Sequence, residues 1–237
     1  MEQLRPSPAW DILLVPFESL FTKSGYRYFR AFVIAFAHLH RRLWVTQVVL
    51  CSGVQRGYPS FCQFLDRGAW RVSNVRRKLF ERCLSVCVDE EGRLLAAVDD
   101  TVCAKYGRHF EGLGVHHDPM NRQHPKKRSR GHCFVCLALL GETFKEHFVA
   151  LFVGCALYVQ QSVREAAQES AKKAGKAGKA FATKLELAVG LVLDLPIPPG
   201  VLVLGICDGA YAKKAFVQPI CASGRHVLSR LRSDTVF

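Results

Sequence analysis

The chain has 237 residues, of which 49% are hydrophobic and 22% are charged. This length suits one large domain or two small ones, and the apolar content excludes a disordered tail protein. Lys and Arg number 33 against 20 Asp and Glu, a formal net charge of +13, which predicts a polyanionic partner, either nucleic acid or an anionic membrane surface.

The hydropathy pattern argues against the membrane. The longest apolar runs are Ala31–Ala37 and Phe148–Val159, well short of the roughly 20 residues that a spanning helix needs. An aspartate and three prolines interrupt the apolar stretch 185–207, and the first ten residues carry Glu2, Arg5 and two prolines instead of an apolar signal core. We therefore expect no membrane partner and a cytoplasmic, nucleoid-associated protein.

The ten cysteines are expected to be buried thiols, because no secretory signal precedes them. The one close pair is Cys133 and Cys136. A structural zinc site needs a second pair of ligands at matching spacing, and none is evident. On a strand, the two side chains would point to opposite faces, which argues against a shared metal.

The first part of the chain reads as helical. Aromatic and aliphatic residues recur at helical spacing, as at Phe29, Phe32 and Phe36. We expect a small helical bundle over residues 1–91 whose aromatic residues form its core and which binds DNA. Its candidate DNA contacts are Arg71, Arg76, Arg77 and Lys78.

From residue 92 onwards the pattern predicts strands. Five apolar runs have strand length: Leu94–Val98, His132–Leu140, His147–Val159, Val201–Ile206 and His226–Leu231. The first three form a meander, and helices precede and follow the fourth. Thr183-x-x-Glu186 is a possible capping box for the helix directly before the fourth run, and Ser162-x-x-Glu165 for an earlier helix over 166–173. The order β-β-β-α-β-α-β is mixed α/β.

Acidic residues follow two of these predicted strands. Asp99 and Asp100 come after the first, and Asp208 comes after the fourth. If the two strands are parallel neighbours, their carboxylates converge at one edge of the sheet. Carboxylate oxygens suit hard divalent cations, and two ions about 3.5–4 Å apart support phosphodiester chemistry. The alternative for each aspartate taken singly is ordinary strand-end polarity or turn capping.

Four segments, in order, resemble the conserved blocks of insertion-sequence DDE transposases. Val98–Gly107 holds Asp-Asp-Thr and then Lys-x-Gly, like the first catalytic block. Ile206–Phe216 is an apolar strand followed by Asp-x-x-Tyr, like the second. The helix at 181–188 and the Arg-x-Arg segment at 229–234 match two further blocks. The resemblance spans roughly residues 15–237 and implies an RNase H-like core over 92–237, with a mixed five-stranded sheet and flanking helices.

The resemblance also implies an activity. It implies cleavage and strand transfer of transposon terminal inverted repeats with Mg²⁺ or Mn²⁺ at a two-metal site, and a homodimer in a synaptic complex. The Asp before the Thr, Asp100, corresponds to the first catalytic carboxylate and Asp208 to the second. Asp99, on the opposite strand face, is a further candidate metal ligand.

The family's third carboxylate is a Glu on a helix beyond the last strand. Here every glutamate precedes Asp208, and the sequence ends at Phe237. From this we expect a C-terminally truncated transposase with impaired catalysis.

Basic residues support a DNA partner. Arg122, Lys126, Lys127, Arg128 and Arg130 cluster without an acid, and a second run of lysines spans 172–184. If these residues neutralise DNA phosphates, the affinity for DNA depends on the salt concentration. The alternative for each cluster is a solvated loop. The candidate DNA contacts are Lys105, Lys126, Lys127, Arg128, Arg130, Tyr211, Arg230 and Arg232. The histidines at 116, 117 and 124 are expected to be exposed.

Two other functions remain open at this point. One is a different RNase H-like nuclease, such as a Holliday-junction resolvase or an integrase relative, with its third acid elsewhere in the fold. The other is a DNA-binding fragment without catalysis. Gel-shift binding without metal-dependent cleavage would favour the DNA-binding fragment.

Overall fold

The computed structural model describes residues 7–39, 45–52, 58–107, 110–122, 125–143, 147–173 and 180–230. The chain divides into two compact units, Met1–Leu79 and Phe80–Phe237, and the border between them falls inside helix α5 (Val72–Cys87). No helix within the described ranges has the length and apolarity needed to cross a membrane.

The first unit is helical, as the aromatic spacing predicts. Its elements before α5 are α1 (Ala9–Leu14), η1 (Val15–Leu20), α2 (Lys23–His38), α3 (Val45–Cys51) and α4 (Tyr58–Arg67). Tyr28, Phe61 and Phe64 form the buried core, with the rings of Tyr28 and Phe61 edge to face at 5.0 Å. The indole N–H of Trp70 donates to the carbonyl of Phe64 at 3.0 Å, which holds the chain after α4 against this core.

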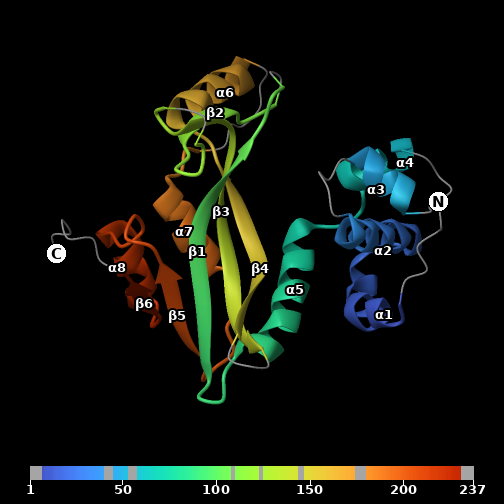
Figure 1. Cartoon of the computed structure of the whole chain (residues 1–237), viewed down its shortest axis with the longest axis horizontal. Helices are drawn as coiled ribbons and strands as arrows, with labels where there is room; N and C mark the ends of the chain where they lie inside the picture. Colours follow the sequence, from blue (N-terminus) through green and yellow to red (C-terminus); the bar gives the residue numbers. More distant parts are fainter. Residues whose placement is uncertain are drawn as a thin grey trace. The chain divides into compact units, whose positions relative to one another are not determined.

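The second unit is built on a mixed sheet (Figure 1). Its described strands are β1 (Arg93–Ala104), β2 (Gly114–His117), β3 (Arg128–Thr143), β4 (His147–Tyr158), β5 (Leu202–Cys207) and β6 (His226–Ser229). The order is β2-β3-β1-β5-β6, and β4 also pairs with β3. β1, β3 and β4 form the antiparallel meander, whereas β5 and β6 continue parallel to β1. This arrangement confirms the predicted mixed α/β class.

Two features of the sheet differ from the sequence prediction. The described sheet has six strands instead of five, because the four-residue strand β2 pairs with the start of β3 and is too short to show a periodicity. In addition, β1 continues past the apolar run that ends at Val98. Its pairing with β3 extends to Ala104 opposite Gly131, so Asp99 and Asp100 lie inside the strand and not at its end.

The helices described after β4 are α6 (Gln161–Lys173), α7 (Lys184–Leu193) and α8 (Lys214–Ala222). The predicted capping box of α7 is confirmed, because Thr183 Oγ1 accepts from the Glu186 N–H at 3.2 Å and the Glu186 carboxylate accepts from the Thr183 N–H at 2.7 Å. α7 packs against β3, β4 and α8. The capping box therefore sets where the first residue of α7, Lys184, meets the sheet.

Gly131 and Gly190 allow two effects of a glycine to be tested separately. At Gly131 the effect is close packing, and at Gly190 it is helix propensity. A Cβ on Gly131 would collide with the carbonyl of Cys103 on β1, whereas a Cβ on Gly190 in α7 would meet no atom within 4 Å. We expect Gly131→Ala to destabilise the protein by about 1–3 kcal/mol, and Gly190→Ala to stabilise it by roughly 0.5–1 kcal/mol. Thermal unfolding followed by circular dichroism measures both, and equal effects would contradict the packing described for β1 and β3.

Candidate active site

Asp100 is the centre of the candidate site. The two-residue period of β1 places it on the same face as the buried Val98. Its Oδ2 accepts from Lys184 Nζ at 2.6 Å and from Cys133 Sγ at 3.4 Å, and its Oδ1 accepts from the Tyr211 hydroxyl at 3.0 Å. Three separate parts of the chain, β3, α7 and the turn after β5, thus hold one carboxylate whose side chain is 23% exposed.

These contacts fix the charge state of the cluster. Burial by itself would raise the pKa of Asp100, but the Lys184 ammonium and the Tyr211 hydroxyl outweigh it and hold this pKa below its ordinary value. Burial likewise opposes the charge on Lys184, and Asp100 raises the pKa of that ammonium. Burial raises the pKa of the Cys133 thiol to about 11 and also raises the pKa of Tyr211. At neutral pH the cluster is an ion pair with two protonated donors.

Asp208 follows β5 directly and its side chain is exposed. Its Oδ1 accepts from the backbone N–H of Ala210 at 3.0 Å and of Tyr211 at 3.3 Å. An aspartate that accepts from backbone groups two and three residues ahead stabilises a tight turn. This turn holds Tyr211 where its hydroxyl reaches Asp100. The Asp-x-x-Tyr motif therefore links the two candidate catalytic carboxylates through a tyrosine.

The strand register explains why these residues meet. β1 and β5 are parallel, and the last residues that pair are Val98 and Cys207. Asp99 follows Val98 in β1, and Asp208 follows Cys207 at the end of β5. Asp99 is exposed, and its Oδ1 accepts from the N–H of Asp100 at 2.7 Å. It lies on the opposite face of β1 from Asp100, as the sequence predicts.

The donor types at this edge suit a divalent cation. Carboxylate oxygens are the ligands that Mg²⁺ and Mn²⁺ prefer, and Asp100 already holds a cation, the Lys184 ammonium, at 2.6 Å. Asp100 and Asp208 therefore fit one hard ion by their chemistry. In the part of the chain that the structure describes, however, no three His, Cys, Asp or Glu side chains converge as a ligand group.

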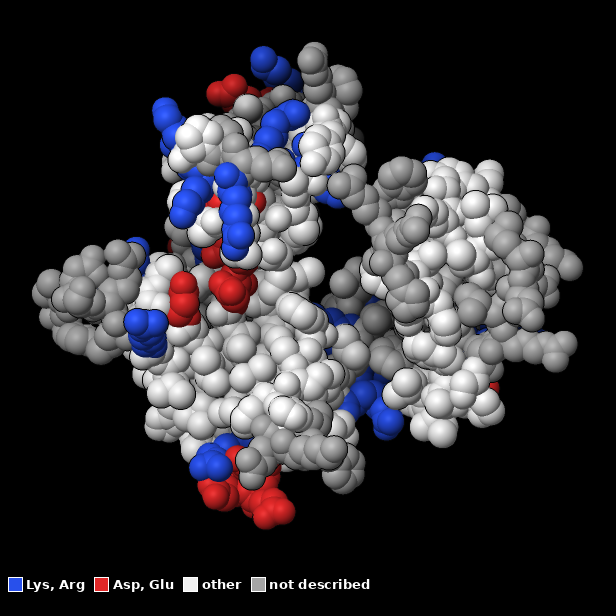
Figure 2. Space-filling model, viewed as in Figure 1, with Lys and Arg blue, Asp and Glu red and all other residues white. Residues whose placement is uncertain are grey.

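Four of the predicted DNA contacts lie on the surface of the β2–β3 hairpin. Lys126 and Lys127 are exposed in its turn, and Arg128 and Arg130 are exposed on one face of β3. Figure 2 shows Lys and Arg side chains gathered at the end of the sheet where β2 and α6 lie. Lys105 is half-buried, with its ammonium 5.9 Å from the centre of the Phe110 ring.

The other predicted contacts lie elsewhere. Tyr211 is only 3% exposed and donates its hydroxyl to Asp100, which is not the exposed position that a DNA contact requires. Arg230 is exposed just after β6, and Arg232 lies outside the described residues.

His116 differs from the exposed side chain that we expect. It lies in β2, is 4% exposed, and its Nε2 has no hydrogen-bond partner among the described residues. Burial and the nearby charge of Lys184 lower its pKa. His117, the next residue, is exposed, and His124 lies outside the described residues.

Sequence reasoning did not identify Lys184 and Cys133 as partners of Asp100. A signal for Lys184 exists in hindsight, because it is the first residue of a capped helix. A cation is unfavourable at that end of a helix, so a lysine there indicates an acidic partner. For Cys133 no local signal exists, since it reaches Asp100 from its place opposite Val102, which depends on the pairing of β3 with β1.

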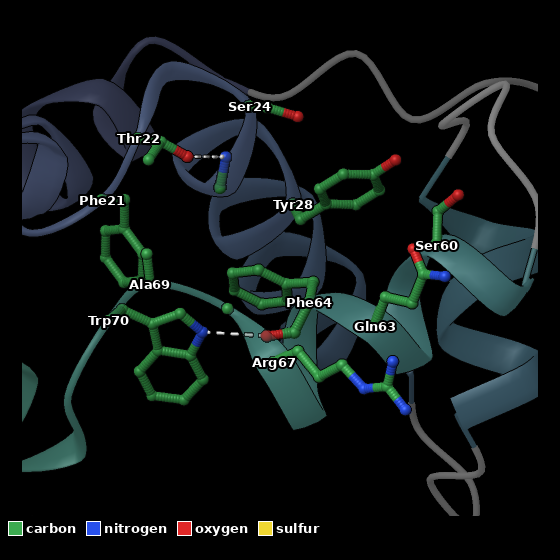
Figure 3. Close-up of a pocket in the computed structure, with 12 residues that line it drawn as sticks. Phe21, Thr22, Ser24, Tyr28, Ser60, Gln63, Phe64, Arg67, Ala69 and Trp70 are labelled. Carbon is green, nitrogen blue, oxygen red and sulfur yellow. Dashed lines mark hydrogen bonds between the residues drawn. The ribbon is translucent and has the colours of Figure 1, made fainter.

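A separate pocket lies within the first unit (Figure 3). It has a volume of about 470 Å³ and is bordered by the start of α2, by α4 and by the segment that leads to Trp70. Aromatic side chains, Phe21, Phe64 and Trp70, face polar ones such as Gln63 and Arg67. None of the residues predicted for catalysis lines it.

Comparisons of this chain with known proteins gave a family match and a similar solved structure. The sequence matches the family described as DDE superfamily endonuclease over residues 17–237. No curated protein matches. Among solved structures, the chain is similar to piggyBac transposase in a cryo-EM structure of its synaptic complex with hairpin DNA, with a TM-score of 0.35 and 11% sequence identity. That likeness covers 99% of this chain and 44% of the piggyBac chain, so this chain spans less than half of the other's length.

The ion pair of Asp100 predicts a pH-dependent stability. Because the pKa of Asp100 is lower in the folded chain than in the unfolded one, its contribution is present at neutral pH and is lost as the pH falls through the folded-state pKa. We expect Asp100→Asn to cost about 1–3 kcal/mol at neutral pH, less than a fully buried pair because Lys184 is 33% exposed. The difference from wild type should narrow below about pH 4.

Urea unfolding at neutral and acidic pH measures this difference. Asp66→Asn is the matched control, since Asp66 pairs with Arg67 at the surface and its loss should change stability little at either pH. A difference for Asp100→Asn that is the same at both pH values would contradict the ion pair.

Proposed function

The chain belongs to the DDE superfamily endonucleases, and from this premise we propose that it acts on transposon-end DNA by metal-dependent phosphodiester cleavage and strand transfer. The observation that carries the proposal is the link between Asp100 in β1 and Asp208 directly after the parallel strand β5, which Tyr211 makes by contacting both carboxylates. Asp100 and Asp208 are the proposed catalytic carboxylates, and Asp99, beside Asp100 on the opposite face of β1, is a further proposed metal ligand.

The proposed roles follow from the positions of the side chains. Asp100 is ionised at neutral pH, so its oxygens are available as anionic ligands. Asp208 is exposed in the turn after β5, where a DNA backbone has access. These two residues would hold Mg²⁺ or Mn²⁺, which when bound supplies activation of the attacking oxygen and stabilisation of the leaving one. Tyr211 is a positioning residue, because it orients Asp100 without reaching the solvent side.

The basic hairpin is the proposed DNA-binding surface. Lys126, Lys127, Arg128 and Arg130 offer four exposed cations on one short segment. Such residues neutralise phosphates without reading the base sequence. We propose terminal inverted repeats as the DNA, and a homodimer that brings two ends together.

We also propose that cleavage by the 237-residue chain is slow. Both oxygens of Asp100 are engaged by side chains of the protein itself, Lys184, Cys133 and Tyr211. The same observation favours a second candidate function, DNA binding without cleavage. Another RNase H-like nuclease would instead cut DNA that carries no transposon end.

Cleavage is tested with plasmid DNA that carries candidate transposon ends, with Mg²⁺ or Mn²⁺. We expect slow nicking by the wild-type chain and none by Asp100→Asn or Asp208→Asn, because each removes an anionic ligand. Asp66→Asn, which neutralises an exposed aspartate of the first unit, should nick like wild type. Nicking that survives in both site variants would overturn the assignment, and DNA binding without any nicking would favour the second candidate function.

DNA binding is tested by gel shift over a range of salt concentrations. Arg128→Gln with Arg130→Gln should weaken binding to all sequences alike and reduce the slope of log affinity against log salt by about 2, or about 1 for each phosphate contact. The control is Arg93→Gln at the opposite end of the sheet, where Asp89 and Glu91 pair with Arg93. An unchanged salt slope in the double variant would exclude the hairpin as the phosphate-binding surface.

A further inference from the structure

Lys184 occupies an unusual place in the fold. It is the first residue of α7, directly after the N-cap Thr183. Its ammonium lies 2.6 Å from Asp100 Oδ2 and 5.6 Å from the centre of the Tyr158 ring. Its side chain remains 33% exposed. The ammonium is thus held by a carboxylate and a ring face while keeping a path to solvent.

Helix stability does not explain this lysine. The N-terminus of a helix carries a partial positive charge, so a cation in the first turn is unfavourable. The capping box already satisfies this end through Thr183 and Glu186. Partial burial adds a further cost for the charged form of Lys184. The interaction with Asp100 offsets both costs, so the position is explained by the carboxylate.

The ammonium stands where a divalent ion would approach Asp100. Tyr211 holds Oδ1, and Lys184 shares Oδ2 with the Cys133 thiol. Two cations on one half-buried carboxylate repel each other strongly, because the surroundings screen charge less than water does. A lysine on its flexible four-carbon stem can leave such a contact, which the planar fork of an arginine does less readily.

We propose that Lys184 is a resident counter-ion of Asp100, which a divalent cation must displace before it can bind. Lys184 then sets the metal concentration that the site requires. In the absence of metal, its ammonium compensates the negative charge of Asp100. This inference rests on the proposed function, in which Asp100 is a metal ligand. It goes beyond that function by naming the side chain that competes with the ion.

The test is the affinity of the whole chain for Mn²⁺ without DNA, measured by isothermal titration calorimetry. Lys184→Gln removes the competing charge, so we expect it to bind Mn²⁺ roughly tenfold more tightly than wild type, within the usual range of coupling between two ligands. Lys184→Arg keeps the charge and should bind no more tightly than wild type. Lys172→Gln, which neutralises an exposed lysine of α6, should match wild type.

Thermal unfolding gives a second readout that controls for folding. Without metal, Lys184→Gln should unfold at a lower temperature than wild type, because Asp100 loses its counter-ion. Saturating Mn²⁺ should raise the unfolding temperature of Lys184→Gln more than that of wild type, since a ligand stabilises the folded state according to its affinity. Adding Asp100→Asn to Lys184→Gln should abolish this response.

The outcomes distinguish the counter-ion role of Lys184 from the metal-ligand role of Asp100 in the proposed function. If Lys184→Gln and wild type bind Mn²⁺ equally and Asp100→Asn abolishes binding, the counter-ion role is overturned while Asp100 remains a metal ligand. If Asp100→Asn leaves the Mn²⁺ affinity unchanged, or if no variant binds Mn²⁺, Asp100 is not the metal ligand and both proposals fail.

Discussion

The ion pair between Asp100 and Lys184 lies where β1, β3, α7 and the turn after β5 meet in the second unit. A carboxylate at this depth would be costly alone, and breaking a buried pair leaves a charge without compensation. The fold supplies its partners from distant places: Cys133 from β3, Lys184 from α7 and Tyr211 from the turn after β5. Each partner depends on the sheet order, because β1 lies between β3 and β5.

Asp208 extends this network to the surface. Its carboxylate caps the turn that carries Tyr211, and Tyr211 in turn donates to Asp100. One exposed acid and one half-buried acid are therefore linked through the turn that carries Tyr211. The groups that make the buried carboxylate tolerable are also the groups that occupy its oxygens. Stability and availability for chemistry oppose each other at this position, as is common at functional sites.

Charge is distributed unequally along the sheet. The β2–β3 hairpin carries exposed basic residues at one end, whereas Asp89 and Glu91 surround Arg93 at the start of β1. Figure 2 shows this contrast between the two ends. A polyanion is attracted to the basic end and repelled from the acidic one. Asp99, Asp100 and Asp208 lie between them along β1 and β5.

Features that depend on neighbouring residues could be predicted from the sequence. Apolar periodicity identified five of the described strands and the helical character of the first unit, and Thr183-x-x-Glu186 identified the start of α7. The order of strands and helices permitted the parallel pairing of β1 with β5. The opposite faces of Asp99 and Asp100 follow from the period of a strand.

Features that depend on distant pairing could not be predicted in this way. β1 continues to Ala104 only because β3 supplies its hydrogen bonds, and β2 exists only as an addition to β3. Tyr211 is an interior hydrogen-bond donor because its turn faces Asp100, 111 residues earlier. Lys184 belongs by sequence to a basic run, and its pairing with an acid 84 residues away appears only when α7 packs on the sheet. Local patterns determined the elements and the candidate acids, whereas the partners of those acids were decided by tertiary packing, because a half-buried charge takes its counter-ion from whichever element the fold brings within reach.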